Sequence, residues 1–163
     1  MITLVLGGAR SGKSAVAEAR AARLAAPLTY VATALVDPAD PDHVARIAAH
    51  RARRDPAWAT IEAGADLVAV VRDTPGSLLV DSLGTWVTAL ASGPDGAALA
   101  AALRDREGDS VVVSEEVGLG VHPSSELGRR FRDVLGEVNQ QVAAVADEVL
   151  LVVAGRVLPL ERP

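Results

Sequence analysis

Cysteine is absent from the 163 residues, and lysine, asparagine and aromatic residues are scarce. Without cysteine, disulfides and thiolate metal sites are excluded. Acidic residues outnumber basic ones by 21 to 16, which gives a formal net charge of −5. A chain with this excess of acid is not expected to take nucleic acid as its main partner, because the phosphate backbone attracts positive charge.

Long hydrophobic runs are missing as well, although half of the residues are hydrophobic. None of the runs approaches the ~20 residues needed to cross a bilayer. The N-terminal MITLVLGG lacks the basic start of a signal peptide and becomes Gly-rich where an apolar stretch would continue. We therefore expect a cytoplasmic protein with no membrane insertion, folded as one domain over residues 1–163.

Five short apolar runs are rich in Val, Leu and Ile without polar alternation, a pattern typical of strands buried on both faces. They are Ile2–Leu6, Leu28–Thr33, Leu78–Asp81, Ser110–Ser114 and Glu148–Val153. Helical segments are expected at Lys13–Ala25, His43–Arg53, Ala97–Arg104 and Ser125–Ala146. The last of these carries an apolar stripe at Leu127, Phe131, Leu135, Val138 and Val142. This alternation predicts an α/β fold, with a mostly parallel central sheet covered by helices on both faces. The tail after Gly155 is expected to be irregular.

A glycine-rich loop follows the first expected strand and fits G-x-x-x-x-G-K-[ST], the pattern of a P-loop. It consists of Gly7, Gly8, Ala9, Arg10, Ser11, Gly12, Lys13 and Ser14. Glycines let backbone N–H groups turn inward around phosphate oxygens, and the helix that follows adds positive charge at its N-terminus. Lys13, which is the single lysine of the chain, would reach the β- and γ-phosphates, while the Ser14 hydroxyl would bind Mg²⁺. The motif therefore predicts a P-loop NTPase-like fold that binds a nucleoside triphosphate.

A second acid is needed near this loop to hold Mg²⁺, and Asp81 closes an apolar strand, Leu78–Asp81. An acid at a strand end is typical of the second nucleotide motif of P-loop enzymes. We expect Asp81 to bind Mg²⁺ together with Ser14. The alternative is that Asp81 caps the helix that follows it.

The expected helix at His43–Arg53 is followed directly by Arg54. Arg46, His50 and Arg54 are spaced four residues apart, so on a helix they share one face. Two interpretations remain open from these residues alone. The face is a solvated basic surface, or His50 is a neutral imidazole that attacks phosphorus while the arginines neutralise phosphate oxygens.

Ordered motifs over nearly the full length resemble the adenosylcobinamide kinase/adenosylcobinamide-phosphate guanylyltransferase family of cobalamin biosynthesis. The matching segments are GGARSGKS, Tyr30–Thr33, Arg46-Ile47-x-x-His50-Arg51, Trp58-x-Thr60-x-Glu62, Asp81-x-Leu83-x-Thr85-Trp86-Val87, Glu116-Val117-Gly118-x-Gly120-x-x-Pro123, Arg130–Asp133, Gly136 and Asn139-Gln140. One departure is Glu115, because the family commonly has Asn before the Glu-Val-Gly motif. The stretch between Asp81 and Ser110 is also short for the family.

The resemblance implies a bifunctional enzyme. It would phosphorylate adenosylcobinamide with GTP or ATP, and would then transfer GMP from GTP to the phosphate through a guanylylated histidine, His50. It also implies a homotrimer. The nucleotide-binding residues carried over are Gly7 to Ser14, Ala32, Thr33, Ala34, Arg51, Ala52, Arg53, Arg54, Glu62 and Asp81.

Two other functions compete with this one. A plain P-loop small-molecule kinase would need the arginines near His50 but no nucleophile. A GTP-switched binding protein would need an Asn-Lys-x-Asp motif, which a chain with one lysine and one asparagine, at Lys13 and Asn139, does not contain.

On the acceptor side, Glu116, Asn139 and Gln140 are candidates to line the cobinamide, although the last two are equally well explained as polar helix positions. Trp58 and Trp86 are expected to be core anchors.

Overall fold

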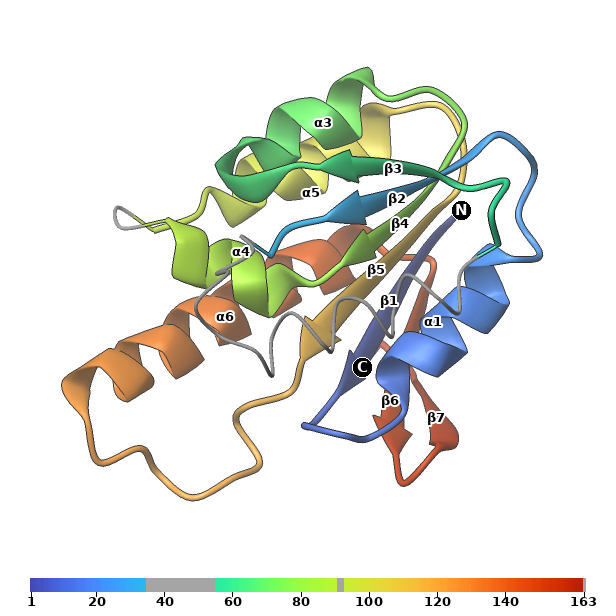
Figure 1. Cartoon of the computed structure of the whole chain (residues 1–163). Coiled ribbons are helices and arrows are strands. Elements are labelled where there is room, and N and C mark those ends of the chain that lie inside the picture. Colours follow the sequence, from blue (N-terminus) through green and yellow to red (C-terminus); the bar gives the residue numbers. More distant parts are fainter. Residues whose placement is uncertain (35–54, 91–92, 163) are drawn as a thin grey trace.

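The computed structural model describes residues 1–34, 55–90 and 93–162 (Figure 1). Its seven strands form one sheet, in the order β3-β2-β4-β5-β1-β6-β7. The strands are β1 (Ile2–Gly7), β2 (Leu28–Ala32), β3 (Ala59–Glu62), β4 (Ser77–Asp81), β5 (Ser110–Glu115), β6 (Glu148–Val153) and β7 (Arg156–Leu160). All pairs are parallel except β6 with β7. The predicted α/β fold with a mostly parallel sheet is confirmed.

Helices pack on both faces of this sheet because the strand residues alternate between two cores. They are α1 (Lys13–Ala21), α3 (Leu67–Asp73), α4 (Leu83–Ala89), α5 (Gly96–Asp105) and α6 (Glu126–Val145), with a 3-10 turn at Gly64–Asp66. In β1, Leu4 and Leu6 face the core shared with α3, α4, α5 and α6. Val5 faces the other core, which α1 closes with Ala17 and Ala21. Among the described residues, no helix is long and apolar enough to span a membrane.

The first helix is shorter than predicted. We expected it to run to Ala25, but α1 ends at Ala21. The two residues that follow turn more tightly, because the amides of Arg23 and Leu24 bond carbonyls three residues back, at 3.1 and 2.9 Å. This tight turn sends the chain back toward β2.

The tail is the clearest error of the sequence analysis. Residues Arg156–Leu160, expected to be irregular, form the antiparallel edge strand β7. The connection from β6 is a two-residue turn, in which Ala154 and Gly155 both have positive φ, as tight hairpins require. Pro159 is accommodated because an edge strand can leave one side of its backbone unpaired.

The apolar stripe of α6 is only partly buried. Leu135, Val138 and Val142 are buried, but Leu127 in the first turn is 79% exposed. Figure 1 shows the reason: the N-terminal part of α6 extends past the edge of the sheet. Ser125 caps this helix, since its hydroxyl accepts a hydrogen bond from the Gly128 amide at 3.1 Å.

Candidate nucleotide site

The P-loop connects β1 to α1 as the sequence predicts. Its backbone turns through positive φ at Arg10 (55°) and Gly12 (97°), and the Ser11 amide bonds the Gly8 carbonyl at 3.3 Å. Gly7 cannot carry a side chain, because a Cβ there would overlap the Ser11 hydroxyl and lie 2.8 Å from the Val152 carbonyl. The loop is therefore closely packed against β6.

The hairpin between β6 and β7 supports the same loop. The Gly155 amide donates a hydrogen bond to the Ser11 carbonyl at 2.8 Å. A Cβ on Gly12 would stand 3.3 Å from the Gly155 Cα, so the two backbones are almost in contact. The turn of the β6–β7 hairpin thus holds the P-loop in place.

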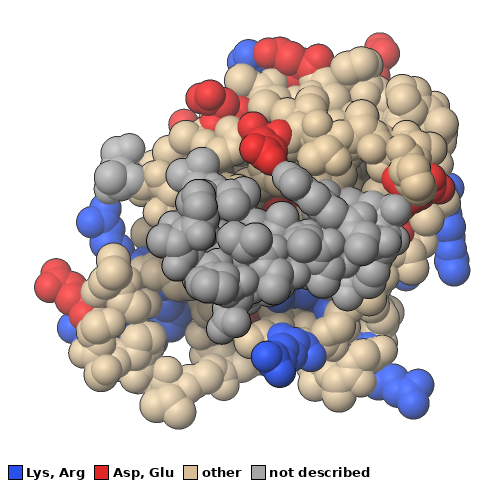
Figure 2. Space-filling model, in the orientation of Figure 1, with Lys and Arg blue, Asp and Glu red and all other residues tan. Residues whose placement is uncertain are grey.

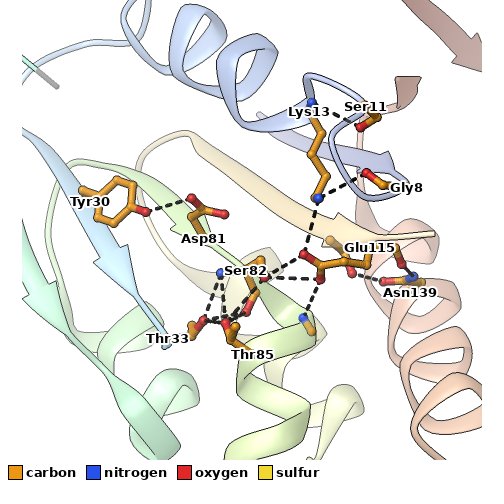
Figure 3. Close-up of polar contacts among 12 residues, drawn as sticks. Gly8, Ser11, Lys13, Tyr30, Thr33, Asp81, Ser82, Thr85, Glu115 and Asn139 are labelled. Carbon is orange, nitrogen blue, oxygen red and sulfur yellow. Dashed lines mark hydrogen bonds and ion pairs between the residues drawn. The ribbon is translucent and has the colours of Figure 1, made fainter. Parts of the chain in front are cut away.

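Lys13, the first residue of α1, projects back across the mouth of the loop (Figure 3). Its Nζ lies 3.5 Å from the Gly8 carbonyl and 3.5 Å from Glu115 Oε1. The Lys13 side chain is 13% exposed, so most of it is shielded from solvent. Ser14 follows it, half-buried in the first turn of α1.

Asp81 lies at the end of β4, at the same edge of the sheet, where one of its oxygens accepts a hydrogen bond from the Tyr30 hydroxyl at 2.8 Å. β5 lies between β4 and β1, so Asp81 is two strands away from the strand that carries the P-loop. The hydroxyl of Ser14 and the carboxylates of Asp81 and Glu115 are oxygen donors of the kind that Mg²⁺ prefers. Within residues 1–34, 55–90 and 93–162, no group of three His, Cys, Asp or Glu side chains forms a protein-only metal cage.

Glu115 is the site residue that the sequence analysis did not assign. It ends β5 directly beside Gly7 of β1, and its carboxylate accepts hydrogen bonds from the Ser82 hydroxyl and the Gly84 amide. An acid that closes an apolar strand was the signal used for Asp81. The same signal, applied to the strand Ser110–Ser114, points to Glu115.

The other predicted nucleotide-binding residues lie at the same edge of the sheet or outside the described part. The Thr33 side chain is fully buried and bonds the backbone of Ser82, and the Thr33 amide donates to the Asp81 carbonyl at 3.3 Å. Ala32 and Ala34 beside it are half-buried, and Glu62 is exposed at the end of β3. His50, Arg51, Ala52, Arg53 and Arg54 lie outside the described residues, as do His43 and Arg46.

A pocket of about 450 Å³ lies between the loop after β5 and helix α6. It is lined by Gly118, Arg132, Asp133, Gly136, Glu137 and Gln140. Asn139 serves the structure instead: it is 8% exposed, and its amide bonds the Ser114 hydroxyl at 2.6 Å and the Glu115 carbonyl at 3.1 Å. The Glu116 amide bonds the Gly7 carbonyl at 3.1 Å, so the loop that lines the pocket starts at the P-loop.

The two tryptophans differ in burial. Trp86 is 1% exposed inside the larger core, as predicted. Trp58 is half-buried and packs against the core on the α1 side of the sheet.

Comparison with known proteins gives concordant matches. A model of the family described as cobinamide kinase / cobinamide phosphate guanyltransferase matches residues 3–160. The chain is 42% identical over 171 residues to the bifunctional adenosylcobalamin biosynthesis protein CobP of Pseudomonas aeruginosa, covering 99% of this chain and 98% of that relative. It is 36% identical over 178 residues to the bifunctional adenosylcobalamin biosynthesis protein CobU of Escherichia coli, covering 95% of this chain and 97% of the relative.

The fold also occurs among solved structures of other proteins. The flagellar accessory protein FlaH from Methanocaldococcus jannaschii aligns with a TM-score of 0.50 at 14% identity, covering 96% of this chain and 74% of the FlaH chain. At this identity the likeness concerns the fold alone.

Proposed function

Since this chain belongs to the cobinamide kinase / cobinamide phosphate guanyltransferase family, we infer that it is a bifunctional enzyme of adenosylcobalamin biosynthesis. It phosphorylates adenosylcobinamide with a nucleoside triphosphate and then transfers GMP from GTP to the phosphate. The observation that carries this function is the P-loop, with Lys13 held across its mouth.

In the kinase step, the acceptor hydroxyl oxygen forms a bond to the γ-phosphorus while the bond from that phosphorus to the bridging oxygen breaks. The nucleoside diphosphate leaves and the hydroxyl proton passes to solvent. Lys13 binds the transferred phosphate, and the backbone amides of the P-loop orient it. Ser14 and Asp81 supply oxygen ligands for Mg²⁺, which when bound neutralises phosphate charge.

For the guanylyl transfer we propose His50 as the nucleophile, on the strength of the family resemblance and of the flanking Arg46 and Arg54. The imidazole nitrogen bonds the α-phosphorus and pyrophosphate leaves. The acceptor phosphate then attacks the same phosphorus and releases the imidazole. Two displacements replace one difficult step, and the arginines stabilise charge on the phosphorus oxygens in both.

The test is incubation of the protein with Mg²⁺ and GTP in the absence of cobinamide, followed by mass mapping of the modified peptide. A GMP adduct on His50, labile in acid and stable in alkali, is expected, together with its loss in His50→Ala. The kinase step is expected to survive in that variant, because the acceptor hydroxyl attacks the γ-phosphorus directly. No adduct, or an equal adduct on His50→Ala, would favour a plain P-loop kinase.

We place the acceptor over the pocket between the loop after β5 and α6. Its lining offers a guanidinium, carboxylates and the Gln140 amide, groups that hydrogen-bond the amide side arms of a corrinoid. Leu119 and Val121 on the adjacent loop are 81% and 96% exposed and offer apolar contact to a macrocycle. The loop leaves the P-loop at Glu116, so an aminopropanol arm has a short path to the phosphates.

The homotrimer remains a proposal. It is supported by the resemblance and by the outer strand β7, where Val157, Leu158 and Leu160 are 43%, 57% and 41% exposed. An edge strand with apolar side chains is a surface that proteins usually cover.

A further inference from the structure

The Glu115 carboxylate makes several contacts beside the P-loop that the roles described above do not explain. It is the last residue of β5, in register with Gly7 of β1, and its side chain is 28% exposed. Figure 3 shows the carboxylate between the Lys13 amine and the turn that begins at Ser82. This position puts a negative charge next to the group that is expected to bind phosphate.

Two donors from the segment after β4 fix this carboxylate. The Ser82 hydroxyl donates to it at 3.1 and 3.2 Å from its two oxygens, and the Gly84 amide donates to Oε2 at 3.0 Å. Gly84 is buried, and a Cβ at this residue would overlap Glu115 Oε2. The absence of a side chain at Gly84 is therefore what allows the close approach.

The remaining partner of the carboxylate is Lys13. Its amine lies 3.5 Å from Glu115 Oε1, and with 13% exposure the Lys13 side chain has little solvent to shield the pair. A triphosphate that binds here must take Lys13 from Glu115. It must also approach a carboxylate of its own sign, in a place where like charges repel strongly.

Asp81 cannot produce this effect to the same degree. Its strand, β4, is separated from β1 by β5 itself, and its carboxylate bonds the Tyr30 hydroxyl. Glu115 is on the nearer strand and contacts Lys13 directly.

We propose that Glu115 makes nucleotide binding depend on a divalent cation. In the empty site the carboxylate holds Lys13 and opposes a bare triphosphate. When a cation accompanies the phosphates, its charge would offset this repulsion, and Glu115 would release Lys13 to the phosphates. The inference rests on the proposed function, in that it takes the P-loop to bind a triphosphate.

The experiment measures the dissociation constant of α,β-methylene-GTP by calorimetry, with Mg²⁺ and with EDTA, since this analogue cannot donate its guanylyl group. In the wild type we expect binding to be much weaker in EDTA. In Glu115→Gln, which keeps an oxygen for the Ser82 and Gly84 donors, we expect the ratio of the EDTA to the Mg²⁺ constant to fall at least tenfold. The fall should come mainly from tighter binding in EDTA.

The matched control is Glu107→Gln. Glu107 is exposed in the turn that precedes β5, at the opposite end of the strand, and its substitution changes the net charge equally. Its ratio should equal that of the wild type. If Glu115→Gln shifts both constants by one common factor, or shifts neither, the proposal is overturned.

Two further variants complete the design. If Glu115→Gln does not give a cooperative thermal transition, Glu115→Asn provides the second test, because it also removes the charge and keeps an amide oxygen at this position. A ratio of the EDTA to the Mg²⁺ constant in Glu115→Asn equal to that of the wild type would then contradict the proposal. Lys13→Ala also distinguishes a failure of this proposal from a failure of the proposed function. If it binds the analogue as tightly as the wild type does, the proposed nucleotide site itself is wrong, whatever Glu115 does.

Discussion

At the scale of single residues, the proposed function depends most directly on Lys13. The Lys13→Ala variant should lower both activities by roughly 10–150-fold or more, since each charge-assisted phosphate contact contributes about 1.5–3 kcal/mol. Steady-state rates of phosphorylation and of GMP transfer measure the effect. Lys13→Arg keeps the charge and controls for it. Wild-type turnover and nucleotide affinity in Lys13→Ala would remove this residue from the mechanism.

Arg106 has a structural role, at the end of the strands opposite the P-loop. Its guanidinium donates to the carbonyls of Val71, Thr74 and Gly76 at 3.1, 2.9 and 2.6 Å, and to the Ser110 hydroxyl at 2.9 Å. Burial lowers the pKa of Arg106 from its ordinary value, but an arginine stays charged throughout the neutral range.

We expect Arg106→Met to lower the free energy of unfolding by about 2–4 kcal/mol, because several carbonyls lose their donor at once. Urea denaturation measures this loss. Arg106→Lys should recover only part of it, since one ammonium cannot reach the same set of acceptors. A stability change within about 0.5 kcal/mol, as for ordinary surface substitutions, would show that other donors or water satisfy these carbonyls.

At the scale of elements, a substitution in helix α6 tests the proposed acceptor site. Gly136 lies in this helix and lines the pocket, and a Cβ there would meet nothing within 4 Å. Gly136→Leu should therefore raise stability by about 0.5–1 kcal/mol through helix propensity, while its side chain fills the pocket. We expect the KM for adenosylcobinamide to rise about tenfold, which corresponds to ~1.4 kcal/mol.

The control for this prediction is Ala144→Leu, an exposed position farther along the same helix. Thermal melting and acceptor titrations at saturating nucleotide are the measurements. An unchanged KM in a stable Gly136→Leu enzyme would move the acceptor elsewhere, with the nucleotide site unaffected.

Some of these elements could be predicted from the sequence and others could not. The P-loop was predictable because an apolar strand, a glycine motif and a helix start are all local signals. The strands β3 and β7 were not, since neither is an apolar run buried on both faces: Ala59, Thr60 and Glu62 are exposed, and so is all of β7. Their structure comes from pairing with β2 and β6. The helices α3 and α4 are seven residues each, too short to show a helical period.

In the candidate site, too, only residues within local sequence patterns could be predicted. Lys13, Ser14 and Asp81 were assigned by local pattern. The contact between Glu115 and Lys13 depends on the order β4-β5-β1, and strand order is a property of the assembled sheet. His50 and its arginines rest on sequence alone, because they lie outside the described residues.

At the scale of the whole molecule, charge is distributed unevenly over the face seen in Figure 2. Acidic side chains gather mostly in its upper half, and basic ones mostly around the lower half, where Figure 1 places the P-loop. An uneven distribution of this kind steers anions toward the basic side despite a net charge of −5.

Assembly is the prediction that belongs to this scale. Light scattering at micromolar concentration should give about three times the chain mass of 16.8 kDa. Leu158→Lys on β7, where the leucine is 57% exposed, should weaken the assembly if that edge is covered in it, and Glu107→Gln provides a variant remote from β7. A mass of one chain for the wild type would reject the trimer.

The position of β1 in the sheet has a consequence for the growing chain. Its partners are β5 and β6, so Ile2 pairs with Ser110 and Thr3 with Glu148. During synthesis β1 leaves the ribosome before either of its partners, so it has no neighbour until β5, more than 100 residues later, has emerged, and its second neighbour, β6, follows later still. Contacts this distant in sequence form slowly. The P-loop is therefore among the first motifs to be translated and among the last to acquire its shape, and the nascent chain must keep an apolar N-terminal strand from pairing elsewhere in the meantime.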